Sequence, residues 1–98
     1  MSDQIKSAIE NSILLLTIAR PEKKNALTAD MYAAMADSIT DADNDKNIRV
    51  ILITGSEDSF TAGNDLKDFL DNPPIESSSP VFQFMHAIAG TKKPVVAA

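Results

Sequence analysis

Hydrophobic residues fall in short blocks whose spacing changes along the chain. Two blocks, within residues 5–19 and separated by Glu10-Asn11, predict a hairpin of two strands, the second of them (13–18) buried. From 28 to 42, apolar residues recur at helical spacing behind Thr28 at the N-cap position, with Asp30 in the first turn. The β-branched block at 48–54 predicts a parallel strand covered on both faces. This order of strand, helix and strand indicates an α/β layer.

The second half of the chain mixes regular and irregular segments. A polar loop at 56–63 precedes a short helix predicted over 65–70, and the proline- and serine-rich segment 72–80 predicts a surface loop or linker. A further helix is predicted over 81–89, with Phe82, Met85 and Ile88/Ala89 as its packing face. The apolar run 95–98 predicts the start of a buried strand. Because an exposed strand end invites aggregation, we expect the chain to continue beyond Ala98 as one domain, with residues 1–98 its N-terminal part.

Composition narrows the classes of function. Nine basic residues against 14 acidic ones give a net charge of −5, which disfavours a general nucleic-acid-binding protein. Cysteine is absent and there is one histidine, so neither a disulfide framework nor a zinc cluster is expected. No apolar run approaches the roughly 20 residues of a membrane span, and the first residues lack signal-peptide features. These observations predict a cytoplasmic protein without membrane or nucleic-acid partners.

The segment 60–66 carries the strongest chemical signal. It follows the strand 48–54 at its carboxyl end, where open α/β sheets place their ligands. Ala62 and Gly63 are small enough for a ligand to approach the backbone, and Asn64 or Asp65 can cap the next helix. An outward-pointing amide there suits developing negative charge on an oxygen, and one such donor contributes roughly 3 kcal/mol. From this local pattern alone, an ordinary turn and helix cap is the alternative interpretation.

Four blocks of the sequence resemble the N-terminal part of the crotonase superfamily, the enoyl-CoA hydratase/isomerase family. In chain order they are Arg20-Pro21-x-x-x-Asn25-Ala26-Leu27, Val50-Ile51-Leu52-Ile53-Thr54-Gly55, Phe60-x-Ala62-Gly63-x-Asp65-Leu66 and Lys93-Pro94-Val95-Val96-Ala97-Ala98. The resemblance implies an α/β fold, a crotonase-like spiral of ββα units. It also implies an acyl-CoA substrate whose enolate is stabilised in an oxyanion hole.

The same resemblance assigns roles to individual residues. It implies that the backbone N–H of Asn64 is one of two oxyanion donors and that the carbonyl of Ala62 accepts from the adenine of coenzyme A. Residues 24–27 would lie along the pantetheine and nucleotide, with Ala26 as a backbone contact and Lys24 as a phosphate partner. Arg20, Lys23 and Lys24 form a basic patch in an acidic chain, which agrees with such a role. The expected substrate-binding residues are therefore Lys24, Ala26, Leu27, Ala62, Gly63, Asn64, Asp65 and Leu66.

The resemblance favours hydration of a trans-2-enoyl-CoA, with 3,2-enoyl-CoA isomerisation as the nearest alternative. It implies that the second oxyanion donor and the catalytic glutamates lie outside residues 1–98. It implies no metal or redox cofactor, with coenzyme A present only as part of the substrate, and a homotrimer or dimer of trimers. A noncatalytic acyl-CoA-binding or assembly homologue remains possible. Without the resemblance, a flavodoxin-like regulatory domain is a further alternative. His86 matches no family motif, so we expect a structural or surface role for it.

Overall fold

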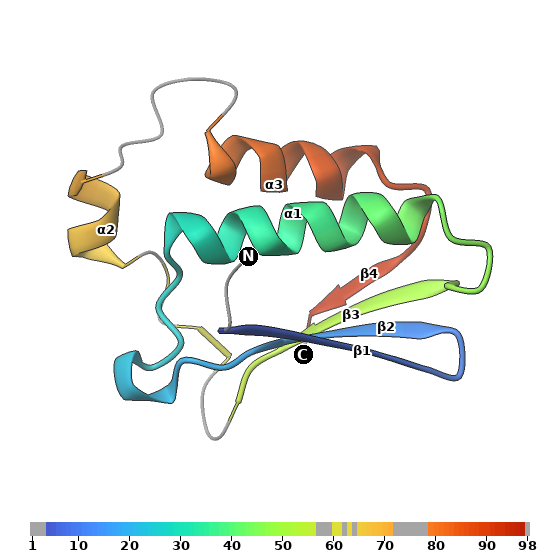
Figure 1. Ribbon diagram of the computed structural model, residues 1–98, viewed down its shortest axis with the longest axis horizontal. Coiled ribbons are helices and arrows are strands. Elements are labelled where there is room, and N and C mark those ends of the chain that lie inside the picture. The colour runs from blue at the N-terminus through green and yellow to red at the C-terminus, as the bar shows by residue number, and fades with distance from the viewer. Residues whose placement is uncertain (1–3, 57–59, 62, 64, 72–78, 98) are drawn as a thin grey trace.

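The chain folds into a four-stranded sheet with its long helices on one side (Figure 1). The computed structural model describes residues 4–56, 60–61, 63, 65–71 and 79–97. Strands are ordered β1-β2-β3-β4, with β1 antiparallel to β2 and the remaining pairs parallel, which confirms the α/β prediction. The elements are β1 (Ile5–Glu10), β2 (Ile13–Ile18), the 3-10 helix η1 (Pro21–Lys23), α1 (Ala29–Asp43), β3 (Val50–Thr54), α2 (Leu66–Asp71), α3 (Pro80–Gly90) and β4 (Val95–Ala97).

The predicted hairpin is present, and a two-residue turn closes it. Ile5 pairs with Ile18 at one end of the ladder and Glu10 pairs with Ile13 at the other. Asn11 and Ser12 between the strands have φ angles of 52° and 67°. Two consecutive left-handed residues match the twist of the flanking strands, and asparagine tolerates this conformation well. The turn therefore fixes which face of β2 meets the helices.

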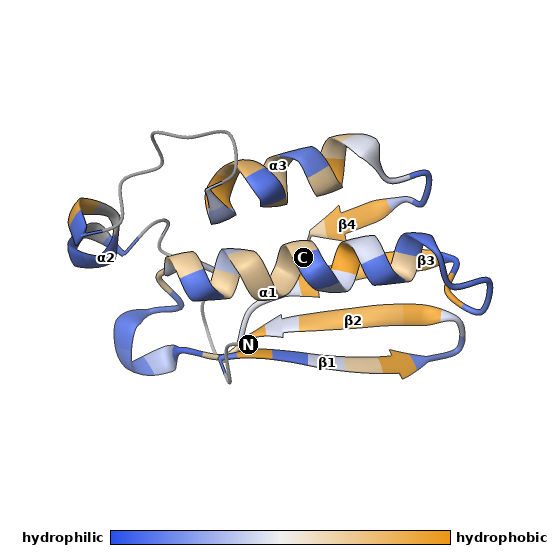
Figure 2. Cartoon of the chain, turned by 45° about the horizontal axis from the view of Figure 1, so that its top comes forward, coloured by the Kyte–Doolittle hydropathy of each residue, from blue (hydrophilic) through white to orange (hydrophobic). Residues whose placement is uncertain are grey.

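Helix α1 follows the predicted pattern and covers the inner face of the sheet. The Thr28 hydroxyl accepts a hydrogen bond from the Met31 amide at 3.3 Å, which confirms the predicted N-cap. Its buried residues pack on the alternate residues of β2 and β3 that face inward. Figure 2 shows hydrophobic residues along both strands and at intervals along α1. Burial of β3 alternates, with Ile51 and Ile53 inside and their neighbours only partly covered. The predicted parallel strand is confirmed, but among the described residues only one of its two faces is fully covered and the other is partly covered.

Helix α3 lies beside α1 on the same side of the sheet (Figures 1 and 2). The predicted packing face is wrong, because Phe84 and Ala87 contact the core while Met85 is 56% exposed. The Phe84 ring packs on the Tyr32 ring of α1, with centroids 5.4 Å apart. This helix is apolar on most sides, so its hydrophobic pattern does not select one face. His86 is exposed, as expected for a surface role.

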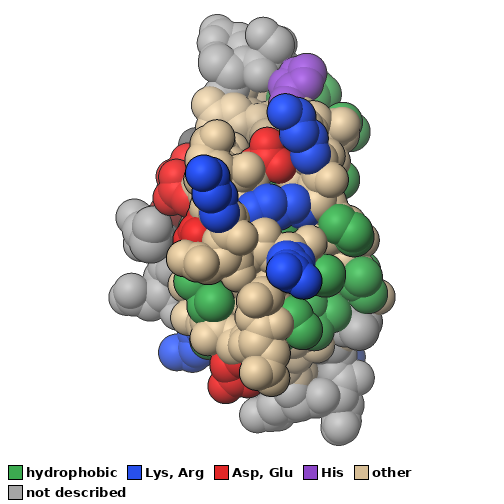
Figure 3. Space-filling view, turned by 90° about the vertical axis from the view of Figure 1, so that its right-hand side faces the viewer, with side chains coloured by type: hydrophobic (Ala, Val, Ile, Leu, Met, Phe, Trp, Pro, Cys, Tyr) green, Lys and Arg blue, Asp and Glu red, His purple; other side chains and the backbone are tan. Residues whose placement is uncertain are grey.

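The C-terminal end of α1 is tied to the segment that leads into β4. Asp43 accepts hydrogen bonds from the Thr91 hydroxyl at 2.8 Å and from the Lys92 amide at 2.9 Å. The Lys93 ammonium group donates to the carbonyls of Ala42 and Asp45. Because α1 has no basic residue in its own last turn, Lys93 supplies the cation that favours a helix C-terminus. Lysine and arginine side chains gather at this end of the molecule (Figure 3).

Candidate functional site

The loop between β2 and α1 is folded around one buried asparagine. Asn25 is fully buried, and its Oδ1 accepts from the Arg20 amide at 2.8 Å and from the Ser56 hydroxyl at 3.1 Å. Its Nδ2 donates to the Ser56 carbonyl at 3.3 Å, and its own carbonyl accepts from the Thr61 hydroxyl at 2.6 Å. Lys24 and Asn25 have φ angles of 51° and 60°, so the chain turns sharply here. Asn25 therefore joins residues 20–27 to the segment that follows β3.

A short backbone pairing connects the same two segments. The Leu27 amide donates to the Gly63 carbonyl at 2.7 Å, and the Asp65 amide donates to the Leu27 carbonyl at 2.8 Å. Gly63 has a φ of 94°, which L-residues rarely adopt, and its amide donates to the Thr61 hydroxyl at 3.1 Å. Glycine is thus needed at this position for its backbone angle. The loop predicted to lie along coenzyme A is consequently bonded to Gly63 and Asp65 of the segment predicted to contact both the adenine and the thioester oxygen.

An ion pair also joins the two segments. Arg20 Nη1 donates to Asp65 Oδ2 at 2.7 Å and to the Ala26 carbonyl at 3.1 Å. Asp65 Oδ1 accepts from the Asp68 amide at 2.9 Å, which confirms Asp65 as the predicted cap of α2. Asp68 Oδ2 in turn accepts from the Ala29 amide at the start of α1, at 2.7 Å. Together these bonds connect the loop, Asp65 and the first turns of α1 and α2.

The hydrogen bonds to Asp65 affect its charge state. The Asp68 amide and the Arg20 guanidinium, in that order, lower the pKa of Asp65 below its ordinary value, because both stabilise the carboxylate. Asp65 is therefore ionised at neutral pH and attracts Arg20 throughout the physiological range. The ion pair is largely covered, since the Arg20 and Asp65 side chains are 14% and 15% exposed.

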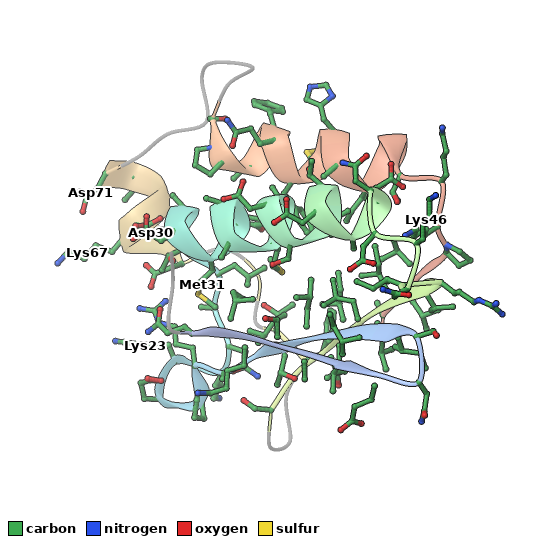
Figure 4. The ribbon with its side chains drawn as sticks, turned by 45° about the vertical axis from the view of Figure 1, so that its right-hand side comes forward. Lys23, Asp30, Met31, Lys46, Lys67 and Asp71 are labelled. Carbon is green, nitrogen blue, oxygen red and sulfur yellow. The ribbon has the colours of Figure 1, made fainter. Side chains whose placement is uncertain are left out.

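Exposed lysines lie on the loop and on α2, near the end of the molecule where α1 begins (Figure 4). Lys23 and Lys24 are exposed on the loop, and Lys67 is exposed on α2. Figure 4 shows Lys23 and Lys67 at the end where α1 begins, with Lys46 at the opposite end. Arg20 belonged to the predicted basic patch, but its Nη1 is engaged by Asp65 and Ala26. The exposed cations of that patch are therefore the two lysines, with Lys67 as an addition that sequence reasoning did not single out.

Comparison with known proteins identifies the family of the chain. The family model described as Enoyl-CoA hydratase/isomerase matches residues 8–98. The chain belongs to the enoyl-CoA hydratase/isomerase family. A curated family relative, 1,2-epoxyphenylacetyl-CoA isomerase of Escherichia coli, is 37% identical over 68 residues, which are 69% of this chain and 26% of the relative.

Solved structures show the crotonase fold as well. The structure of Pseudomonas aeruginosa OdaA matches with a TM-score of 0.93 and 46% identity, covering 99% of this chain and 39% of the other. That of an enoyl-CoA hydratase/isomerase from Pseudoalteromonas atlantica matches with a TM-score of 0.88 and 44% identity, covering 97% of this chain and 38% of the other. The chain thus spans about two fifths of the length of these two structures.

The structure describes most of the predicted site residues. Lys24, Ala26 and Leu27 lie on the loop, and Gly63 and Asp65 are hydrogen-bonded to Leu27. Leu66 is the first residue of α2, whereas Ala62 and Asn64 lie outside the described residues. No helix among the described residues has the length and apolar character needed to cross a bilayer.

Two features of the site were not predicted from the sequence. Asn25 stood in a recognised block, but its burial and its contacts with Ser56 and Thr61 were not predicted. The only signal was that asparagine tolerates left-handed backbone better than most residues. The pairing of Arg20 with Asp65 joins residues 45 positions apart, and no local pattern connects them.

Proposed function

We propose that the native protein containing this chain binds an acyl-CoA thioester and hydrates trans-2-enoyl-CoA. The observation that carries the proposal is the backbone pairing of Leu27 with Gly63 and Asp65. It brings the loop assigned to coenzyme A against the turn assigned to the thioester oxygen. Membership of the enoyl-CoA hydratase/isomerase family supports an acyl-CoA substrate. In this proposal coenzyme A enters as part of the substrate, and no metal or redox cofactor is required.

The chemistry assigned to this part of the protein is stabilisation of an enolate. Addition of water across the double bond moves negative charge onto the thioester oxygen, and the Asn64 N–H is assigned to donate to that oxygen. One donor fixed in this way contributes about 3 kcal/mol to transition-state stabilisation. Lys23 and Lys24 are exposed on the neighbouring loop and can attract the phosphates of coenzyme A. That attraction weakens as salt concentration rises.

The test follows the absorbance of the enoyl thioester in a short trans-2-enoyl-CoA as it is lost on hydration. Asn64→Pro removes the N–H, while the matched control Asn64→Ala changes the side chain and keeps the N–H. We expect the proline variant to lose about 100-fold to 1,000-fold in kcat and the alanine variant to stay within about threefold. Titration with a saturated acyl-CoA shows whether binding persists in both variants.

The main alternative is 3,2-enoyl-CoA isomerisation, because the matched family description names both reactions. Incubation with a 3-enoyl-CoA, which lacks the conjugated absorbance, separates the two. Appearance of that absorbance without subsequent hydration would replace hydratase by isomerase and keep the oxyanion assignment. Binding of acyl-CoA without either reaction would indicate a noncatalytic binding protein. Failure to bind any acyl-CoA would refute the proposed function.

A further inference from the structure

The backbone pairing between the two loops is too short to fix their relative orientation. Both of its hydrogen bonds involve one residue, Leu27, which pairs with Gly63 on one side and Asp65 on the other. Two bonds to a single residue act as a hinge, about which one segment can tilt against the other. Contacts away from the hinge are needed to fix the angle, and the Thr61 hydroxyl, which bonds both the Asn25 carbonyl and the Gly63 amide, provides one of them.

The ion pair between Arg20 and Asp65 supplies a second such contact, at the Asp65 end of the pairing. Arg20 holds the Ala26 carbonyl on the loop and the Asp65 carboxylate on the turn with the same nitrogen, at 3.1 and 2.7 Å. Both side chains are largely covered, which limits the screening of their attraction by solvent and salt. Asp65 is also restrained on its other oxygen by the Asp68 amide. Neither side chain belongs to the hydrophobic core among the described residues.

We propose that Arg20 and Asp65 are positioning residues that hold residues 24–27 and the backbone at Gly63 and Asp65 in the orientation required for turnover of acyl-CoA. The inference rests on the proposed function and assigns to it two residues whose side chains bond to the backbone of the site. Because a displacement of about 1 Å at a reacting group can cost about 100-fold in rate, a small tilt between the segments is sufficient to lower kcat.

The experiment compares two carboxylates with similar hydrogen bonding in the native protein containing this chain. Asp65→Asn removes the charge but keeps an oxygen able to accept from the Asp68 amide. Asp43→Asn is the matched control, because Asp43 accepts from Thr91 and Lys92 at the far end of α1. Both variants are assayed for kcat, KM and thermal unfolding, at a temperature where circular dichroism shows them folded.

We expect Asp65→Asn to lower kcat by about 10-fold to 100-fold, whereas Asp43→Asn stays within about twofold. Both should lower the unfolding midpoint. A double-mutant cycle adds a second criterion, since Arg20→Gln combined with Asp65→Asn should lose little more than either single variant. Should Asp65→Asn fail to fold, Arg20→Lys replaces it, because lysine keeps the charge but lacks the planar fork. That variant should show a smaller loss of kcat in the same direction.

Activity and binding of the unaltered protein distinguish a failure of the positioning role from a failure of the proposed function. If it turns over an enoyl-CoA while Asp65→Asn matches Asp43→Asn in kcat, the positioning role is overturned and the proposed function stands. The same holds if Arg20→Lys, as the substitute variant, leaves kcat unchanged. If the unaltered protein neither converts nor binds acyl-CoA, the proposed function fails and the positioning role fails with it.

Discussion

Replacing Asn25 by alanine should destabilise the protein far more than its position in a surface loop would suggest. The substitution leaves the Arg20 amide and the Ser56 carbonyl without their partner, in a place where Asn25 itself is fully buried. Each such group costs about 1–2 kcal/mol, and alanine at a φ of 60° adds about 1 kcal/mol. The expected loss is about 3–5 kcal/mol, a large part of the 5–15 kcal/mol typical of a folded protein.

Urea unfolding of the native protein containing this chain measures this loss of stability. Two matched variants separate the cost of the backbone angle from the cost of the lost hydrogen bonds. Asn25→Gly accepts the left-handed backbone, so it should be about 1 kcal/mol less destabilising than Asn25→Ala. Asn11→Ala places alanine at a φ of 52° in an exposed turn, where we expect a loss of only about 1 kcal/mol. Equal losses for Asn25→Ala and Asn11→Ala would refute the argument, because the buried hydrogen bonds would then contribute nothing.

Three further predictions concern other parts of the molecule. Gly63→Ala should cost about 1–3 kcal/mol through its φ of 94° alone, because no described atom lies within 4 Å of a Cβ placed there; urea unfolding measures this. Lys93→Met should cost about 1–2 kcal/mol in the same assay by leaving the Ala42 carbonyl without its cation. Hydrogen bonds lower the pKa of both Asp43 and Asp65 in the folded state. Their stabilisation is therefore present above the unfolded pKa of about 3.9 and is lost as pH falls through the folded pKa, which unfolding between about pH 2 and pH 6 detects.

Each of these predictions has an outcome that contradicts it. A Gly63→Ala variant as stable as the unaltered protein would mean that the turn relaxes to a conformation alanine accepts. If Lys93→Met leaves the free energy of unfolding unchanged, water replaces the ammonium group at no cost in stability. If Asp43→Asn and Asp65→Asn leave the acid dependence of unfolding unchanged, these two carboxylates do not contribute to it.

The elements that depend on local patterns were predictable from the sequence. The hairpin followed from two apolar blocks around a turn, and α1 followed from Thr28 and the helical spacing behind it. The packing face of α3 was not predictable, because apolar residues surround the helix and the contact of Phe84 with Tyr32 depends on where α1 lies. The alternating burial of β3 likewise depends on which elements cover each face of the sheet.

The candidate site was only partly predictable for the same reason. Its position after β3 and the requirement for a small residue at Gly63 followed from local arguments. Its internal structure depends on partners far apart in the sequence, such as Asn25 with Ser56 and Arg20 with Asp65. The resemblance suggested that the basic patch containing Arg20 pairs with the phosphates of coenzyme A, whereas the fold gives Arg20 a carboxylate partner within the chain.

The pairing of Leu27 with Gly63 and Asp65 also bears on how such a site diversifies. It is made by main-chain atoms on both sides, and at Leu27 any residue except proline provides the same amide and carbonyl, whereas position 63 needs glycine for its backbone angle. Side chains on the two loops that make none of the contacts described above are therefore free to change during evolution while the spacing of the loops is preserved. The main-chain bonds that join the two loops and the side chains that would face a substrate can be selected separately. Side chains at positions such as Ala26 are therefore the natural place to alter substrate preference.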